Sequence, residues 1–183
     1  MSTPKGLSYW ETPRESIACT YKNNDIAYAT SGMHAAATVL KYLNVSFGEL
    51  QNSTILDFGC GTGRVARPLS FFFKRVIAYD PVQSCIDTAK TECKVSTPNI
   101  RYTSVLPTGD ICDFCCAVNV LEHLSQEDQT NALNLIKRNV KPQGRIVLWY
   151  SPDDNYKAIQ EAFPEQKVTR GKPGIYIDVF FNT

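Results

Sequence analysis

Three glycines at alternate positions, Gly59, Gly61 and Gly63, follow directly on a short apolar segment. Glycines in this position allow a tight turn and let a ligand approach bare backbone at the start of a helix. Asp80 ends the next apolar segment, 17 residues after Gly63, where a carboxylate can accept hydrogen bonds from both hydroxyls of a ribose. Together these residues indicate a site for an adenosine-containing ligand, although Asp80 before Pro81 is also a common turn sequence.

The residues around the glycines narrow the kind of ligand. A dinucleotide fingerprint needs glycine or alanine where this chain has Arg64, whose bulk opposes close packing of helix on strand. The Lys-Ser/Thr pair of a triphosphate-binding loop does not occur here either. Asp57 instead places a carboxylate two residues before the first glycine, which repels a pyrophosphate and suits a positively charged ligand. S-adenosylmethionine has such charges on its ammonium and sulfonium groups.

Alternating apolar and amphipathic segments position these residues. We expect strands at 54–58, 75–79, 99–105, 113–119 and 145–150, and helices at 64–73, 82–93, 125–140 and after Ser151-Pro152. An earlier helix, capped by Ser31, would bury Met33, Ala36, Ala37, Leu40 and Leu43. Strands at 166–170 and 175–181 are joined too closely for a crossover and must form a hairpin. This pattern predicts an α/β, Rossmann-like, doubly wound, three-layer αβα fold, with a sheet parallel except for its last strand.

Four motifs in order resemble those of class I S-adenosylmethionine-dependent methyltransferases. Residues 55–63 closely resemble the first motif, and Asp80 matches the ribose-binding acid. Residues 113–124 look like the fourth strand with its Leu-Glu-His-Leu ending, and residues 140–145 are similar to the turn before the fifth strand. The resemblance runs from about residue 30 to the end. It implies a small, minimal-core enzyme with a seven-stranded sheet in the order 3-2-1-4-5-7-6.

The resemblance also implies roles for single residues. The methionine part of the donor would lie against Asp57, Gly59, Cys60, Gly61, Gly63, Asn119 and Val120. Asp80 would hold the ribose, and Pro81 would lie near the adenine. Relatives often have an acid after the third strand that accepts from the adenine amino group; here Ser104 or the backbone of Val105 would substitute.

Methyl transfer depends mainly on alignment, and it needs a base only when the acceptor arrives protonated. His123 is the candidate base, with Glu122 beside it, because histidine titrates near neutral pH and this position follows the fourth strand. Alternatively, both residues fix the loop and cap the next helix. Tyr150 is a candidate for the acceptor pocket.

Two patterns resemble metal sites, but we expect no metal. Cys112 and Cys115 form a C-x-x-C sequence inside an expected strand, where they would point to opposite faces. A zinc site needs further ligand pairs, and the two histidines, His34 and His123, stand apart. The acids Asp153 and Asp154 are better interpreted as favourable charges in the first turn of a helix.

Composition and charge limit the partners, the domain organisation and the cellular location that we expect. The 183 residues carry a net charge of +1, which argues against a dedicated nucleic-acid or membrane surface.

We expect one methyltransferase domain, 1–183, with an N-terminal lid and helix extension at 1–45 and a cofactor-binding core at 46–183. The first twenty residues lack an apolar run and the chain has seven cysteines, which favours a reduced, cytoplasmic protein. The extension contains Trp10, Tyr21 and Tyr28, which could fold over the site or simply pack.

The predicted function is therefore transfer of a methyl group from S-adenosylmethionine to an oxygen or nitrogen of a small molecule. Sequences typical of nucleic-acid methylation, Asn/Asp-Pro-Pro-aromatic or Pro-Cys, do not occur. The alternatives are a nicotinamide-dependent oxidoreductase and a non-catalytic S-adenosylmethionine-binding regulatory module. We expect a monomer or homodimer.

Overall fold

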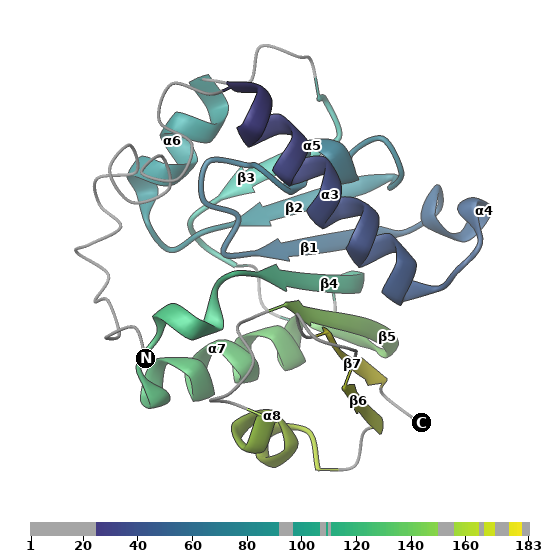
Figure 1. Ribbon diagram of the computed structural model, residues 1–183, viewed down its shortest axis with the longest axis vertical. Helices are drawn as coiled ribbons and strands as arrows, with labels where there is room; N and C mark the ends of the chain where they lie inside the picture. Colours follow the sequence, from purple (N-terminus) through teal and green to yellow (C-terminus); the bar gives the residue numbers. More distant parts are fainter. Residues whose placement is uncertain are drawn as a thin grey trace.

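A twisted sheet with the strand order β3-β2-β1-β4-β5-β7-β6 runs through the centre of the computed structural model (Figure 1). The structure describes residues 25–91, 97–106, 109, 111–149, 156–164, 167–170 and 176–180. Neighbouring strands from β3 to β5 are parallel, whereas β7 is antiparallel to both β5 and β6. The strands are β1 (Thr54–Phe58), β2 (Arg75–Tyr79), β3 (Ile100–Thr103), β4 (Cys112–Val118), β5 (Val140–Trp149), β6 (Lys167–Arg170) and β7 (Tyr176–Phe180). The expected Rossmann-like fold is confirmed.

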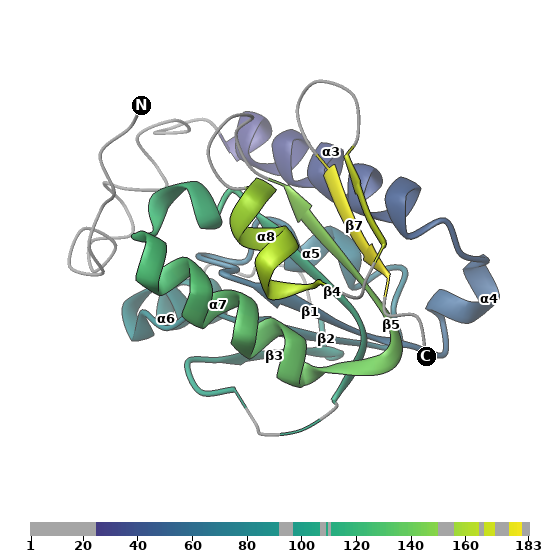
Figure 2. The same cartoon turned by 90° about the horizontal axis from the view of Figure 1, so that it is seen from below.

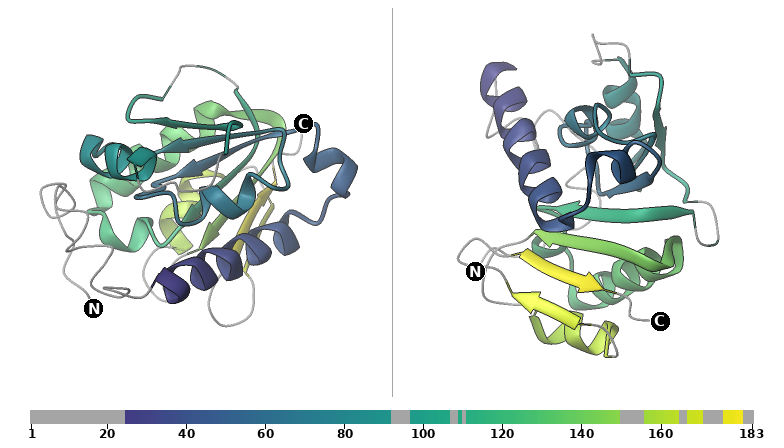
Figure 3. Two further views of the ribbon diagram at one scale, coloured as in Figure 1. Left: turned by 90° about the horizontal axis from the view of Figure 1, so that it is seen from above. Right: turned by 90° about the vertical axis from the view of Figure 1, so that its right-hand side faces the viewer.

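Helices cover both faces of the sheet (Figures 1 and 2). One face packs on α3 (Asp25–Leu43), α5 (Ala66–Leu69) and α6 (Gln83–Thr91) through Ile55, Val76 and Phe114. The other face packs on α7 (Gln126–Asn139) and α8 (Tyr156–Ala162) through the alternate residues, such as Leu56 and Ile77. This alternation follows from the two-residue period of a strand. Both views of Figure 3 show the sheet between the two helical layers.

Helix α3 differs from the predicted helix in its start and in its buried face. It begins at Asp25, so Ser31 lies inside it and its hydroxyl donates to the carbonyl of Tyr28 at 2.8 Å. Met33 is 61% exposed and Ala37 is also exposed. The buried residues are Gly32, Ala35, Ala36, Val39 and Leu43. The prediction that Met33 and Ala37 are buried is wrong, because the helix is turned so that Gly32 lies against the backbone of Arg64, and Met33 and Ala37 lie outside the face that it shares.

The helix after the glycines is also shorter than expected. Residues 61–65 continue the turn, with positive φ at Gly61 and Gly63, so that α5 contains only Ala66–Leu69 instead of 64–73. On the opposite side of the sheet, α7 begins as predicted: the Ser125 hydroxyl accepts from the amide of Asp128 at 3.2 Å. A 3-10 helix, η1 (Leu121–His123), and a short helix, α4 (Phe47–Leu50), complete these elements.

An irregularity in β4 changes the position of the C-x-x-C cysteines. The register with β5 shifts between Cys112 and Phe114, and both Cys112 and Cys115 lie in the apolar cluster on the α7 side. The prediction that they point to opposite faces is wrong, because the pairing with β5 is irregular here: Cys112 lies opposite Val140, but Phe114 lies opposite Arg145. Among the described residues, no group of three or more His, Cys, Asp or Glu side chains could hold a metal ion.

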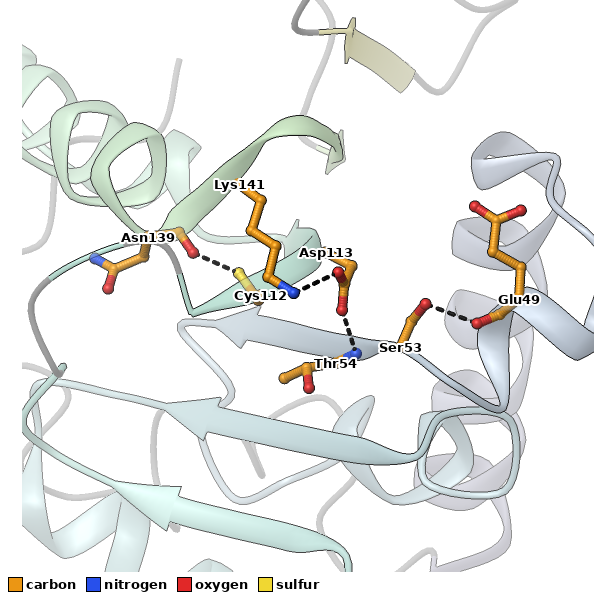
Figure 4. Close-up of polar contacts among 7 residues, drawn as sticks. All are labelled: Glu49, Ser53, Thr54, Cys112, Asp113, Asn139 and Lys141. Carbon is orange, nitrogen blue, oxygen red and sulfur yellow. Dashed lines mark hydrogen bonds and ion pairs between the residues drawn. The ribbon is translucent and has the colours of Figure 1, made fainter.

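Asp113, which lies at this irregularity, joins the amino ends of three strands (Figure 4). Its carboxylate accepts from the amide of Thr54 at 2.8 Å and from the Lys141 ammonium at 2.7 Å. Cys112 donates to the carbonyl of Asn139 at 2.8 Å in the same region. These contacts lie at the amino edge of the sheet and fix the alignment of β1, β4 and β5.

Several predictions concern residues outside the described part of the chain: Trp10, Tyr21, Tyr150, Ser151-Pro152, Asp153, Asp154 and the turn at 171–174. Of the predicted inward face of α8, Ile159 and Phe163 are buried. No helix in the described ranges combines the length and the apolar character needed to cross a membrane.

Candidate functional site

The glycine turn lies at the carboxyl edge of the sheet, between the ends of β1, β2 and β4. The amides of Gly59 and Cys60 both donate to the carbonyl of Tyr79, at 2.8 and 2.9 Å. Gly59 has a φ of +72°, and a Cβ added there would lie 2.5 Å from a methyl carbon of Val120. The turn therefore requires glycine at this position both for its backbone conformation and for its close approach to the segment after β4.

Asp57 presents an unpaired carboxylate oxygen to this turn. The side chain is 1% exposed, and Oδ1 accepts from the Cys116 thiol at 3.6 Å across the β1–β4 register. Oδ2 is buried without a hydrogen-bond partner in the part of the chain that the structure describes. Burial and the nearby Asp80 charge raise the pKa of Asp57 to about 7, while the Cys116 thiol, the positive charge of Arg64 and the nearby backbone amide of Ala66 lower it. The Ala66 amide does not reach hydrogen-bond geometry with Oδ2. An unpaired buried oxygen of this kind suits a cationic ligand group.

Asp80 connects the glycine turn to the segment after β2. Its Oδ2 accepts from the amide of Gly61 and its Oδ1 from the amide of Val82, both at 2.9 Å. Burial raises the pKa of Asp80, and the two amide hydrogen bonds oppose this effect. A carboxylate has about four acceptor positions, so each oxygen can accept a further hydrogen bond. The turn-forming role and a ligand-binding role are therefore compatible.

A pocket of about 390 Å³ opens between these residues and α7. Of the residues predicted from the sequence, it is lined by Asp57, Gly59, Cys60, Gly61, Asp80, Pro81, Asn119, Val120 and His123. The structure thus brings together groups from three strand ends that are far apart along the chain. Arg64 and Cys85 also line the pocket.

Four predicted site residues lie beside the pocket instead of lining it. Gly63 packs against Tyr102, whose hydroxyl would be 2.8 Å from a Cβ added at the glycine. Ser104 donates to the side-chain oxygen of Gln83, and Val105 is 73% exposed. Glu122 is the fourth and lies in η1.

One wall of the pocket was not anticipated from the sequence. Leu124 and the exposed helical residues Asp128, Asn131 and Leu135 line it, together with the buried Ala132. The spacing of Asp128, Asn131 and Leu135 by three and four residues was a usable signal, because it places them on one face of α7; Leu124 lies just before that helix. This wall is apolar near Leu124 and polar at Asp128 and Asn131.

His123 and Glu122 lie close together where η1 leaves β4. The imidazole Nε2 is 3.9 Å from a Glu122 carboxylate oxygen, and burial raises the pKa of Glu122 to about 7. Asn119, just before η1, has a φ of +57° and its amide donates to the carbonyl of Trp149 at 2.9 Å. The chain therefore turns sharply after β4 and places the His123 side chain at the pocket.

The parallel sheet, the glycine turn after β1 and the acids that end β1 and β2 define an α/β protein with a nucleoside site of the methyltransferase class. The chain belongs to the methyltransferase domain family, whose model matches residues 32–168.

Two curated relatives are similar to the chain in sequence. It is 30% identical over 147 residues to a ubiquinone biosynthesis O-methyltransferase of Rickettsia conorii, covering 75% of this chain and 50% of the relative. It is 35% identical over 103 residues to the Rickettsia akari protein of the same name, covering 54% and 40%. The chain thus spans about half the length of the curated relatives it matches.

Two solved structures have a fold similar to that of this chain, although their sequence identity to it is low. A Methanococcus maripaludis protein described as an S-adenosyl-L-methionine-dependent methyltransferase has a TM-score of 0.74 at 14% identity, covering 100% of this chain and 98% of that one. An S-adenosylmethionine-dependent methyltransferase of Aquifex aeolicus has a TM-score of 0.64 at 19% identity, covering 80% and 89%. These similarities show that the fold is that of S-adenosylmethionine-dependent methyltransferases.

Proposed function

We propose that this chain transfers a methyl group from S-adenosylmethionine to an oxygen or nitrogen of a small molecule. The observation that carries the proposal is the unpaired, buried Oδ2 of Asp57 at the wall of the pocket. A buried anionic oxygen without a partner is costly unless a ligand supplies one. The amino group of S-adenosylmethionine is such a partner, whereas a pyrophosphate would be repelled.

The remaining residues fit the other parts of the donor. Asp80 retains acceptor capacity for ribose hydroxyls after binding its two amides. Bare backbone at Gly59 and Gly61 permits close approach of the methionine part. The adenine would lie between Pro81 and the α7 wall near Leu124, with Ser104 and Val105 at the edge of its site.

Catalysis by this site rests on alignment and, for some acceptors, on a base. When bound, S-adenosylmethionine supplies a methyl group activated by positively charged sulfur, which an acceptor atom displaces in line. Asn119 and Val120 would border that methyl group at the mouth of β4. His123 would accept the proton of a hydroxyl or ammonium acceptor, with the Glu122 carboxylate orienting the imidazole. If both residues only shape the loop, the acceptor must arrive already deprotonated.

The similarity to curated relatives and the low net charge of the chain support a small-molecule methyl acceptor. The matched relatives are named for ubiquinone biosynthesis, and the chain has a net charge of only +1, which is little for binding nucleic acid. We further propose that residues 1–183 form one domain that acts as a monomer or homodimer. A cytoplasmic location is consistent with the free cysteines Cys60, Cys85, Cys112, Cys115 and Cys116.

Calorimetry tests donor binding directly. We expect S-adenosylhomocysteine and S-adenosylmethionine to bind, NAD not to bind, and Asp80→Ala to lose binding. Glu49→Ala, which removes an exposed acid on α4 that does not line the pocket, is the matched control. A protein that binds NAD and ignores both sulfur nucleosides would be an oxidoreductase instead.

Catalysis needs a second assay. Transfer of a radiolabelled methyl group to pooled phenolic and amine metabolites should give labelled small molecules. Donor binding without transfer to any pool or to cell lysate would favour the regulatory-module alternative.

A further inference from the structure

The glycine turn is contacted from outside the pocket by one face of α3. Tyr28, Ser31 and Gly32 are spaced by three and four residues, so they share a side of the helix. Their contacts are with residues 62–67, the second half of the turn and the start of α5. No residue of α3, which is described along its whole length, lines the pocket.

The closest of these contacts is at Gly32. A Cβ added at this position would lie 2.2 Å from the carbonyl oxygen of Arg64, well inside van der Waals contact. The atom it would meet is backbone, so a side-chain rotation cannot relieve the overlap. The α3 helix therefore rests directly on the backbone of the turn, and any side chain at position 32 must displace one of the two.

Two side-chain contacts extend the same interface. The Tyr28 hydroxyl is hydrogen-bonded to the Thr62 hydroxyl at 2.7 Å, and the Arg67 guanidinium lies 5.9 Å from the Tyr28 ring centre. Arg67 also donates to the carbonyl of Thr62 at 3.0 Å. A guanidinium nitrogen of Arg64 lies 3.5 Å from the Ser31 hydroxyl. The α3 face therefore contacts the turn at Thr62 and Arg64 and the start of α5 at Arg67.

The residues held in this way face the proposed donor. Thr62 and Arg64 line the pocket, and the Arg64 charge acts on the Asp57 carboxyl. We propose that the Tyr28–Ser31–Gly32 face of α3 positions the glycine turn and thereby sets donor affinity without touching the donor. This inference rests on the proposed function, because it names S-adenosylmethionine as the ligand whose affinity changes.

Two variants and one control test the inference. Gly32→Ala should shift the Arg64 carbonyl and weaken S-adenosylhomocysteine binding about tenfold or more, since small displacements in a preorganised site are costly. Tyr28→Phe removes only the hydroxyl contact and should weaken binding about threefold. Met33→Ala changes an exposed side chain on the same helix and should bind as the unmodified protein does.

Hydrogen exchange of the unliganded protein supplies a readout that does not depend on the donor. Amides at 61–65 should exchange faster in Gly32→Ala and Tyr28→Phe than in Met33→Ala. If Gly32→Ala does not fold, the S-adenosylhomocysteine affinity and the amide exchange of Tyr28→Phe test the inference. Variants that unfold at lower temperature yet keep unchanged affinity and exchange at 61–65 would overturn the inference. Failure of the unmodified protein to bind S-adenosylhomocysteine would reject the proposed function, while exchange would still test whether α3 holds the turn.

Discussion

Replacing Asp57 by asparagine should stabilise the protein at alkaline pH while removing its ability to bind the methyl donor. The change keeps the size of the side chain and the acceptor oxygen that the Cys116 thiol contacts. It removes the capacity to ionise and replaces Oδ2 with an amide nitrogen, which donates instead of accepting. Because an amide does not titrate, the pH dependence of the effects on folding and on binding reports the charge.

The size of the stability effect follows from the pKa. An aspartate outside the fold has a pKa of 3.8, and burial raises that of Asp57 to about 7. The folded state thus holds the proton more tightly, so this group lowers stability progressively between these two pH values and fully above the higher one. At about 1.4 kcal/mol per pH unit, the cost reaches an upper limit of about 4 kcal/mol at pH 8 and about 2 kcal/mol at pH 5.

Urea denaturation at pH 5 and pH 8 measures this difference. Asp57→Asn should be more stable than the unmodified protein at both pH values, with the larger gain at pH 8. Asp87→Asn changes an exposed carboxylate and is the matched control. A variant that is destabilised at pH 8, or whose gain does not grow with pH, would refute the assignment of an uncompensated buried charge at Asp57.

Donor affinity should rise with pH, whereas the ionised Asp57 lowers the stability of the folded protein as pH rises. Binding an ammonium group requires the ionised carboxylate, so with a pKa of about 7 the affinity for S-adenosylhomocysteine should be about tenfold weaker at pH 6 than at pH 8. Glu122 also has a pKa raised to about 7. The Asp57→Asn variant shows which of the two carboxyl groups causes the pH dependence of affinity. Asp57→Asn should bind at least about a hundredfold more weakly and lose the pH dependence. Equal affinity of the unmodified protein at both pH values would contradict this reasoning.

Three further predictions concern the other parts of the site. Gly59→Ala should lower the free energy of unfolding by about 1–3 kcal/mol, because of its positive φ and the contact with Val120; urea denaturation beside Gly48→Ala, which has open space, checks this. Asp80→Ala should abolish detectable donor binding in calorimetry and speed amide exchange at Gly61, whose hydrogen bond it removes; unchanged exchange would contradict it. His123→Gln should lower kcat about a hundredfold for a hydroxyl acceptor without changing S-adenosylhomocysteine affinity; an unchanged kcat would assign His123 to the loop only.

The sequence predicts those parts of the site that depend on order along the chain. In a parallel sheet the residues that end successive strands meet at one edge, so Asp57, the glycines and Asp80 could be placed from the chain order alone. Asp57 was informative for a second reason, because its charge distinguishes between classes of nucleotide ligand. Asn119, which the family resemblance suggested, and His123, which follows the fourth strand, both line the pocket, and their roles there stay predictions.

The features that were missed depend on contacts between distant segments. The buried face of α3 is chosen by the close approach at Gly32, which hydrophobicity does not indicate. The positions of Cys112 and Cys115 depend on the irregular pairing of β4 with β5, where Asp113 binds the Thr54 amide and the Lys141 ammonium. The short strand β3 ends at Thr103, and Ser104 binds Gln83, a contact that the sequence does not indicate; the role of Ser104 and Val105 at the adenine stays a prediction.

A crystal structure with S-adenosylhomocysteine tests the central claim most directly, because it locates each part of the ligand. We predict the ligand amino group at about 3 Å from Oδ2 of Asp57 and the ribose hydroxyls on Asp80. A ligand whose amino group lies away from Asp57, or a soaked dinucleotide whose phosphates rest on the glycine turn, would contradict the claim.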